Sequence, residues 1–337
     1  MIISVQLLRF VAAFFVVLAH SLGEYEWAKP FGNFGVDIFF VISGFIIYVI
    51  TDQNTNFFFT RRLIRIIPMY WLFTLVICFV AYFQPNLVRS TTFDVNHIIT
   101  SLFFFPYWIE GAGFFPILRL GWTLNFEMFF YLIFYFSMQL SHKHRAILTS
   151  LVMILMVMIL NSMENFSEKS FLNFYSTTIW FEFIFGMAIG IFYKNFNGFK
   201  MEIQSTVILT LLLIGLIGLM SCIEIFGNSS YTRTFKFGLP SSLLLIVILN
   251  FETVFFRANT AIKKMILWLG EMSYPLYLIH MYCIAMLHRV LFQEIEFWLL
   301  FPIALFLSLL LSYVVSWLYD NPLRKWFSSK LLNYQNK

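Results

Sequence analysis

The chain has 337 residues, of which 60% are apolar and only 12% are charged, and its formal net charge is +5. A soluble domain would carry about twice that charged fraction. The composition therefore excludes a soluble globular protein and predicts one that crosses a membrane several times, with membrane lipid and no nucleic acid among its partners.

Apolar runs of about membrane length recur along the whole chain and predict transmembrane helices. In chain order they are 3–22, 34–51, 66–83, 122–140, 146–161, 175–193, 205–223, 237–250, 266–287 and 297–319. The stretch 98–109 is too short to span, so we interpret it as a re-entrant or interfacial segment. We expect an all-α integral membrane protein with about ten transmembrane helices, in a single transmembrane domain over residues 1–337.

The distribution of Lys and Arg predicts the orientation of these helices. If the N-terminus is inside, the basic clusters at 61–65, 257–264 and 324–330 all fall on the cytoplasmic side, and the outer segments carry fewer basic residues. Cytoplasmic loops are enriched in Lys and Arg. We therefore expect both termini in the cytoplasm, and a multi-pass protein of the cell (inner or cytoplasmic) membrane.

The first apolar run carries two ionisable residues, Arg9 and His20. At 100° per residue, the eleven steps from Arg9 to His20 make three turns plus about 20°, so both lie on one helix face, roughly 16 Å apart. Ionisable groups inside a bilayer are costly and mark a functional path by default. Alternatively, Arg9 extends to the cytoplasmic head groups and His20 to the opposite interface.

Four ionisable residues share one predicted depth near the outer side. His20 ends the first run, Asp37 begins the second, Glu127 lies in the first turns of the fourth, and His280 lies in the outer half of the ninth. We expect these side chains to converge in a shared polar cavity, although helix ends are also the cheapest places for polar residues. Glu182, about two turns into the sixth run, either joins this cavity or makes a helix contact.

A neutral imidazole is the obvious general base at neutral pH, which favours His20. A carboxylate bonded to its other nitrogen, from Asp37 or Glu127, would fix the tautomer and stabilise the imidazolium. The chain has no Gly-x-Ser-x-Gly motif. Direct transfer, in which His20 deprotonates an acceptor hydroxyl, is therefore more economical than a covalent acyl-enzyme. His280 either lines the same site or is a hydrogen-bonded packing residue.

Three arginines stand just before the third run, at Arg61, Arg62 and Arg65. Their i,i+3 and i,i+4 spacings allow one cationic cluster at the start of a helix. Arginine binds phosphate through two hydrogen bonds, so the cluster suits a nucleotide-bearing donor. The alternative is anchoring on anionic lipid at the cytoplasmic surface.

Two further patterns concern helix faces. Small residues Ser43 and Gly44 inside the second run predict a close helix contact. Tyr274, Tyr277 and His280 recur every three residues around Pro275. This polar stripe could line a substrate channel, although tyrosines are also common at membrane interfaces.

Six segments, in order, resemble the motifs of membrane-bound acyltransferase family 3, which includes OafA- and ExoZ-like polysaccharide O-acetyltransferases. The matching segments are Arg9 with His20; Gly35-Val36-Asp37 with Ser43-Gly44-Phe45; Phe58 to Trp71; Trp122-Thr123-Leu124 with Glu127, Phe130 and Tyr131; Ser273-Tyr274 with Tyr277, Leu278 and His280; and Asp320-Asn321-Pro322. The last carries Asp where Glu is more usual, and the third has a one-residue offset at its Phe.

The resemblance implies transfer of an acyl group, usually acetyl, from acyl-CoA to a hydroxyl of a surface or exported polysaccharide or its lipid-linked precursor. It implies His20 as the catalytic base, and we expect Asp37 and Glu127, the two candidate carboxylate partners, as further catalytic residues. It implies contacts between the donor's phosphates and Arg9 with the arginine cluster. By its motifs it also implies substrate-binding residues, which are Trp122, Tyr274, Tyr277 and His280.

The resemblance implies acetyl-CoA or another acyl-CoA as a co-substrate, with no permanently bound cofactor. We expect no metal, because Cys78, Cys222 and Cys283 lie in apolar runs at no ligand spacing. The chain stops soon after its last run, so it resembles the stand-alone members without an SGNH domain. This favours transfer completed within the membrane domain.

Two other classes of function remain open at this point. A transporter or flippase for an anionic glycolipid could use the same buried charges as a relay. The lack of an evident inverted repeat in the sequence speaks against transport. A membrane sensor without catalysis is a third hypothesis, for which the sequence offers no signalling domain.

Overall fold

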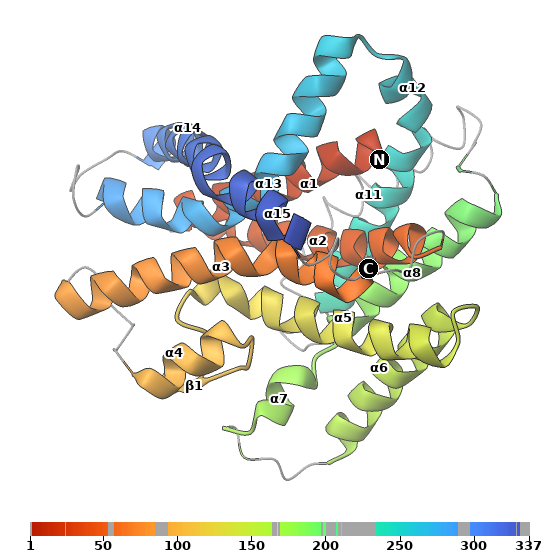
Figure 1. Cartoon of the computed structure of the whole chain (residues 1–337), viewed down its shortest axis with the longest axis horizontal. Coiled ribbons are helices and arrows are strands. Elements are labelled where there is room, and N and C mark those ends of the chain that lie inside the picture. The colour runs from red at the N-terminus through yellow and green to blue at the C-terminus, as the bar shows by residue number, and fades with distance from the viewer. Residues whose placement is uncertain are drawn as a thin grey trace. The chain divides into compact units, whose positions relative to one another are not determined.

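The computed structural model describes residues 2–23, 25–52, 57–84, 94–163, 167, 169–196, 198–199, 207, 210, 233–288, 297–327 and 329–330 (Figure 1). Within this part of the chain the regular structure is helical, apart from one hairpin of β1 (Trp108–Ile109) and β2 (Gly113–Phe114). The predicted run 205–223 lies almost wholly outside the described residues.

The chain folds as two compact units, residues 1–53 with 178–309 and residues 54–177 with 310–337. The first unit contains α1 (Ile3–Ser21), α2 (Lys29–Ile50), α8 (Trp180–Asn195), the π-helical turn η3 (Thr234–Gly238), α11 (Leu239–Asn250), α12 (Glu252–Arg257), α13 (Thr260–Met286) and most of α14 (Phe297–Val315). The second contains α3 (Phe58–Phe83), α4 (Val95–Leu102), the hairpin, η2 (Arg119–Gly121), α5 (Trp122–Leu140), α6 (Arg145–Ser162), α7 (Phe171–Tyr175), η5 (Ser316–Asp320) and α15 (Asn321–Phe327).

Among the described residues, 6 helices are long and apolar enough to cross a membrane. They are Ile3–Ser21, Lys29–Ile50, Phe58–Phe83, Arg145–Ser162, Phe171–Asn195 and Leu299–Tyr319. Outside this group, α5 and α13 also fall on predicted runs. The prediction of an all-α, multi-pass membrane protein is confirmed, whereas the count of about ten spans and the side of the termini stay predictions.

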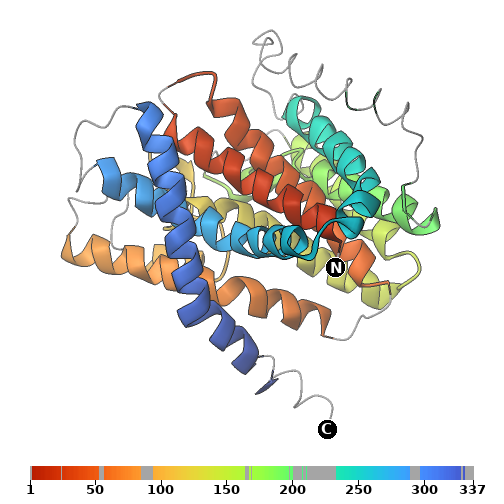
Figure 2. The same cartoon turned by 90° about the horizontal axis from the view of Figure 1, so that it is seen from above.

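In the first unit, α2 packs between α1 and α8, as Figure 2 shows for the adjoining α1 and α2. Glycines permit this close approach. A Cβ on Gly35 would lie 2.5 Å from the carbonyl oxygen of Ala12 on α1, and one on Gly44 would lie 2.1 Å from that of Phe183 on α8. Because lipid is as apolar as a side chain, such close packing is a main source of helix association in membranes. The predicted close contact at Gly44 is confirmed.

The apolar core of the first unit joins four helices. Its buried members are Val5, Leu8 and Ala12 of α1, Phe34, Ile38, Val41, Ile42 and Phe45 of α2, Ile189 of α8, and Leu245 and Leu249 of α11. This core fixes α1 and α2 as the rigid frame from which the polar residues project.

Helix α13 lies along α1, and the two run in the same direction. A Cβ on Gly270 would lie 2.5 Å from the side chain of Gln6, and Leu276 packs against Ala13 and Val17 further along both helices. The absence of a side chain at Gly270 therefore lets α13 approach the polar face of α1. Parallel helices in contact carry their C-terminal halves to the same level.

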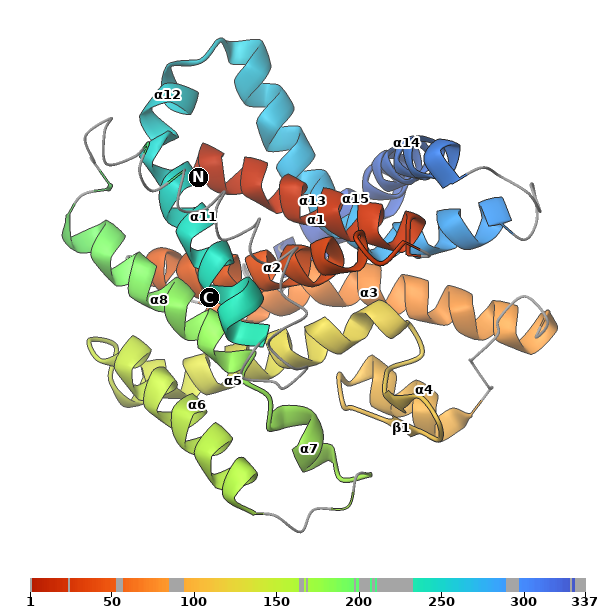
Figure 3. The ribbon, with the colours of Figure 1, turned by 180° about the vertical axis from the view of Figure 1, so that it is seen from behind.

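In the second unit, α3 and α5 run in opposite directions with an axial offset (Figure 3). A Cβ on Gly121, just before α5, would lie 2.6 Å from the ring of Tyr70, in the middle of α3. The ring of Phe58, at the start of α3, lies 6.2 Å from that of Tyr131. Helix α5 therefore begins beside the middle of α3 and passes its first turns.

The segment expected to be re-entrant or interfacial forms α4 and the β-hairpin, and it does not span. Asp94 caps α4 by accepting a hydrogen bond from the Asn96 amide at 2.9 Å. The Trp71 indole donates to the carbonyl oxygen of Leu102 at 2.9 Å, which fixes the end of α4 to the middle of α3. Its position in a membrane stays a prediction.

Candidate active site

Two imidazoles meet where α1 and α13 lie side by side. His280 Nε2 lies 3.0 Å from His20 Nδ1, and the ring centroids are 5.1 Å apart. His280 is completely buried, whereas His20 is exposed at the end of α1. Each ring also faces a carbonyl oxygen of its own helix, His280 Nδ1 that of Leu276 at 3.2 Å and His20 Nδ1 that of Val16 at 3.0 Å.

These contacts define the tautomers of the neutral pair. A carbonyl oxygen only accepts, so His280 Nδ1 carries the proton and donates to Leu276, which leaves His280 Nε2 as an acceptor. His20 Nδ1 faces two acceptors and must therefore carry its own proton. The lone pair of His20 is consequently on Nε2, the nitrogen that is not engaged by either contact. This is the form of imidazole that a general base requires.

Arg9 lies on the same face of α1, as its spacing from His20 predicts. It is buried, and its Nη1 donates to Gln6 Oε1 at 3.2 Å. Gln6 in turn faces Gly270 on α13. The guanidinium is therefore enclosed by protein, which speaks against the alternative that Arg9 extends to the lipid head groups.

Of the two tyrosines on the polar stripe of α13, Tyr277 lies next to His280. The Tyr277 ring is buried, 6.1 Å from that of His280 and 5.8 Å from that of Phe39 on α2. Tyr274 is half-buried. Tyr277 therefore supports the imidazole pair from the side of α2, and a role in binding substrate stays a prediction for both tyrosines.

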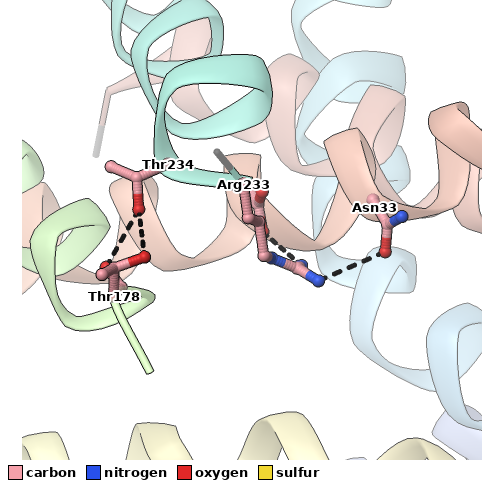
Figure 4. A network of polar contacts seen from close by, with 5 residues as sticks. Asn33, Thr178, Arg233 and Thr234 are labelled. Atoms are coloured by element: carbon pink, nitrogen blue, oxygen red, sulfur yellow. Dashed lines mark hydrogen bonds and ion pairs between the residues drawn. The ribbon is translucent and has the colours of Figure 1, made fainter. Parts of the chain in front are cut away.

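Asp37 does not contact His20. It is completely buried, and Arg233 Nη2 donates to its Oδ1 at 2.6 Å. Arg233 Nη1 donates to Asn33 Oδ1 at 3.3 Å (Figure 4). Gly35 turns toward α1, and Asp37 stands about 200° further around α2. The prediction that Asp37 orients His20 is therefore wrong in geometry, because His280 occupies that position.

Glu182 on α8 joins Asp37 rather than the histidines. It is completely buried, and it interacts electrostatically with both Asp37 and Arg233. Of the two possibilities open for Glu182, the structure thus shows a contact between α8 and α2. The sequence places Arg233 in an outer loop and indicates no role for it. The sequence feature that could have drawn attention to Arg233 is its position directly before an apolar run.

Glu127 lies beside an arginine that the sequence places far from it. Tyr131 Oη donates to Glu127 Oε1 one turn along α5, and Arg62 on α3 hydrogen-bonds with Tyr131 and interacts with Glu127. The sequence predicts Glu127 near the outer side and Arg62 at the cytoplasmic mouth. That separation is wrong, because α5 passes the first turns of α3. Glu127 belongs to the second unit, and its place beside His20 stays a prediction.

The three arginines do not present one face. Arg61 is exposed, Arg62 is turned toward α5, and Arg65 is half-buried within electrostatic reach of Tyr131. Consecutive residues point about 100° apart on a helix. The cationic cluster as a site for a phosphate-bearing donor stays a prediction, and within it Arg62 already interacts with Tyr131 and Glu127. Trp122, the first residue of α5, is half-buried, 6.0 Å from the Phe126 ring.

A protein family and a known protein match this chain along most of its length. Residues 2–317 match the family model described as an acyltransferase domain, so the match runs through both units. ExoZ of Rhizobium meliloti (strain 1021), an exopolysaccharide production protein, is 33% identical over 281 residues, which cover 81% of this chain and 83% of ExoZ.

More distant relatives carry O-acetyltransferase names. The O-acetyltransferase OatA of Staphylococcus aureus (strain NCTC 8325 / PS 47) is 26% identical over 350 residues, covering 94% of this chain and 56% of that protein. The peptidoglycan O-acetyltransferase OatA of Listeria monocytogenes is 31% identical over 148 residues, 39% of this chain and 23% of that protein. The chain thus spans little more than half the length of the Staphylococcus relative. No solved structure matches it.

Proposed function

Because the chain belongs to the acyltransferase 3 family, we propose that it moves an acyl group, most simply acetyl, from acyl-CoA to a hydroxyl of a surface or exported polysaccharide or its lipid-linked precursor. The relatives support this assignment, since one is named for exopolysaccharide production and two for O-acetyl transfer. We place the protein in the cytoplasmic membrane, where acyl-CoA reaches it from the cytoplasm.

The observation that carries the proposal is the imidazole pair. His20 Nε2 has the free lone pair, and His20 Nδ1–H donates to His280 Nε2 at 3.0 Å. In the reaction, Nε2 takes the proton of the acceptor hydroxyl as its oxygen attacks the thioester carbonyl. The C–S bond then breaks, and the imidazolium returns that proton to the departing thiolate. The products are an ester and free CoA thiol.

His280 holds the base in the productive form. Its neutral Nε2 accepts a hydrogen bond from the His20 imidazolium as well as from neutral His20, so it stabilises the charged form without becoming charged itself. Because His280 is buried and its Nδ1 faces the carbonyl oxygen of Leu276, it cannot rotate without losing that contact. The pair therefore replaces the carboxylate that usually orients a catalytic histidine.

Donor binding in this proposal falls to Arg61 and Arg65. Their guanidinium groups suit the pyrophosphate and ribose phosphate of CoA. Arg62 already interacts with Glu127 and Tyr131, so its role is to hold α3 against α5. Arg9 contacts the donor or keeps Gln6 and α1 in place, and Trp122, Tyr274 and Tyr277 are the proposed acceptor contacts.

The test is a reaction of the purified protein in lipid nanodiscs with acetyl-CoA, with and without a lipid-linked or polymeric glycan. The proposal expects release of CoA thiol that depends on the glycan, and a matching acetyl mass on the glycan. A flippase would instead move the glycolipid across a vesicle membrane with no thioester consumed. Movement without thioester cleavage would overturn the proposal.

A further inference from the structure

A second polar group lies in the first unit, on the face of α2 turned away from α1. It consists of Asp37 on α2, Glu182 on α8 and Arg233 directly before η3. Both acids are completely buried. The proposed acyl transfer uses none of the three.

The charges of this group do not balance if both acids are ionised. Arg233 donates to Asp37 at 2.6 Å, and it is the one cation in electrostatic range of either acid among the described residues. Two carboxylates and one guanidinium would leave a net negative charge in a dry interior, which is strongly unfavourable.

The two carboxyl groups also lack hydrogen-bond donors. Neither oxygen of Glu182, nor Oδ2 of Asp37, has a donor among the described residues, although all three atoms are buried. The two carboxyl groups themselves are within hydrogen-bonding reach of one another. Two carboxylates cannot bond to each other, because both only accept. A proton on one of them removes the excess charge and supplies the missing donor.

We propose that Glu182 and Asp37 bind one proton between them, so that the site holds a carboxylic acid, a carboxylate and a guanidinium with no net charge. Arg233 stabilises the negative charge on Asp37, which assigns the proton to Glu182. Its O–H then donates to Asp37.

This proton-binding site joins three elements. Asp37 belongs to α2 and Glu182 to α8, while a Cβ on Gly238 of η3 would lie 2.9 Å from Glu182 Cγ. The contact between Thr234 Oγ1 and Thr178 Oγ1 at 2.8 Å fixes η3 to the chain just before α8 (Figure 4). Loss of the proton would leave two carboxylates facing one arginine at the point where α2 and α8 pack through glycines.

Two amide substitutions separate this proposal from a fully ionised pair. In Glu182→Gln the amide N–H donates to Asp37 as the acid does, so the charge is unchanged. In Asp37→Asn, Glu182 becomes the carboxylate that pairs with Arg233. We expect thermal stability close to wild type in Glu182→Gln. If both acids were ionised, the same substitution would remove an excess charge and raise the unfolding temperature.

The direct readout is the infrared carbonyl stretch of a protonated carboxyl group, measured on the full chain in lipid nanodiscs. We expect a band that shifts when the protein is labelled with [13C]glutamate, and that is lost in both amide variants. Glu252→Gln is the matched control. Glu252 lies outside the Asp37–Glu182 pair, and its two oxygens accept the amide N–H groups of Ile3 and Ser4 at 2.9 and 2.8 Å, so its substitution should leave the band intact.

The labelled wild-type protein tests the proposal even if a variant fails to fold. Absence of any glutamate-derived protonated carboxyl band would overturn the proposal. A band that persists in Glu182→Gln would also overturn it, since the proton would then be on another glutamate. Neither result bears on acyl transfer, which is measured by CoA release.

Discussion

His280 Nε2 lies 3.0 Å from His20 Nδ1, and this contact joins a buried imidazole to an exposed one. Each ring also faces a carbonyl oxygen of its own helix. Because a carbonyl oxygen can only accept, these contacts determine which nitrogen donates in each of the three hydrogen bonds. The result is a His20 imidazole with its lone pair on Nε2. In the proposed reaction His280 is a positioning residue and His20 the catalytic one.

The positioning role predicts different outcomes for two substitutions at residue 280. His280→Leu removes the acceptor for His20 Nδ1–H, and we expect kcat to fall on the order of 10–100-fold with little change in KM, the loss that corresponds to one hydrogen bond to a charged group. His280→Gln keeps a side-chain oxygen that can accept, and should retain more of kcat. Steady-state kinetics over a range of pH measure both. Equal losses in the two variants, matched by equal losses of thermal stability, would indicate packing alone.

The contact between Arg62 and the Glu127–Tyr131 pair predicts strong coupling in stability. Arg62→Gln or Glu127→Gln alone leaves a half-buried charge without the opposite charge beside it, which should lower the free energy of unfolding by about 1.5–3 kcal/mol. The double variant should lose less than the sum of the two, because neither charge remains. Unfolding in detergent measures the cycle, with Arg61→Gln, an exposed neighbour, as control. Additive losses would show that Arg62 and Glu127 do not interact.

The glycine contact between α2 and α8 predicts a graded response to an added methyl group. In Gly44→Ala the new Cβ would lie 2.1 Å from the backbone oxygen of Phe183, so the helices must move apart. In Gly190→Ala it would lie 3.0 Å from the side chain of Tyr48, which can rotate. We expect overpacking in the former to cost about 1–3 kcal/mol, and clearly more than in the latter. Equal unfolding temperatures would contradict the close contact.

The α4 segment, outside the membrane-spanning helices, is predicted to open in acid. The Tyr107 hydroxyl donates to Asp94 and lowers the pKa of that carboxyl. Burial lowers the pKa of His97, whose Nε2–H donates to the carbonyl oxygen of Phe115 at 3.0 Å. Both groups bind protons more weakly when folded, so the stability they contribute is present at neutral pH. It is lost as the pH falls below the unfolded histidine value of about 6.5, and then through the carboxyl range.

Hydrogen exchange of residues 94–118 between neutral pH and about pH 5 measures this opening. His97→Gln supplies the control, because its amide can still donate to Phe115 but does not titrate. That variant should lose the histidine part of the pH dependence. Exchange that does not change with pH in the wild-type protein would contradict the prediction.

The sequence alone predicts most of the helices and the shared face of Arg9 and His20, because apolar length and helical periodicity are local properties. It does not predict which face of α2 meets α1. That choice depends on Gly32 and Gly35, which bring α2 against α1 and turn Asp37 toward α8. Arg233 then completes the Asp37 contact from almost 200 residues away, a pairing that no local pattern encodes.

The position of Glu127 illustrates a second limit. Hydropathy gives the length of α5 but not its axial offset from α3, which is determined by the contact of Tyr70 with Gly121. Assigning both helices the same membrane boundaries therefore separates Glu127 from Arg62. The histidine pair is within reach of sequence reasoning, since the sequence places both residues at one depth, but their direct contact depends on the parallel packing at Gly270.

The most direct test of the account is the rate of glycan-dependent CoA release by purified His20→Gln protein in nanodiscs. If His20 is the general base, the rate should fall about 10²–10⁴-fold, the usual contribution of such a group. His144→Gln, a substitution at an exposed histidine of the second unit, should leave the rate unchanged. A His20→Gln protein that folds normally and keeps the wild-type rate would contradict the assignment of His20 as the base.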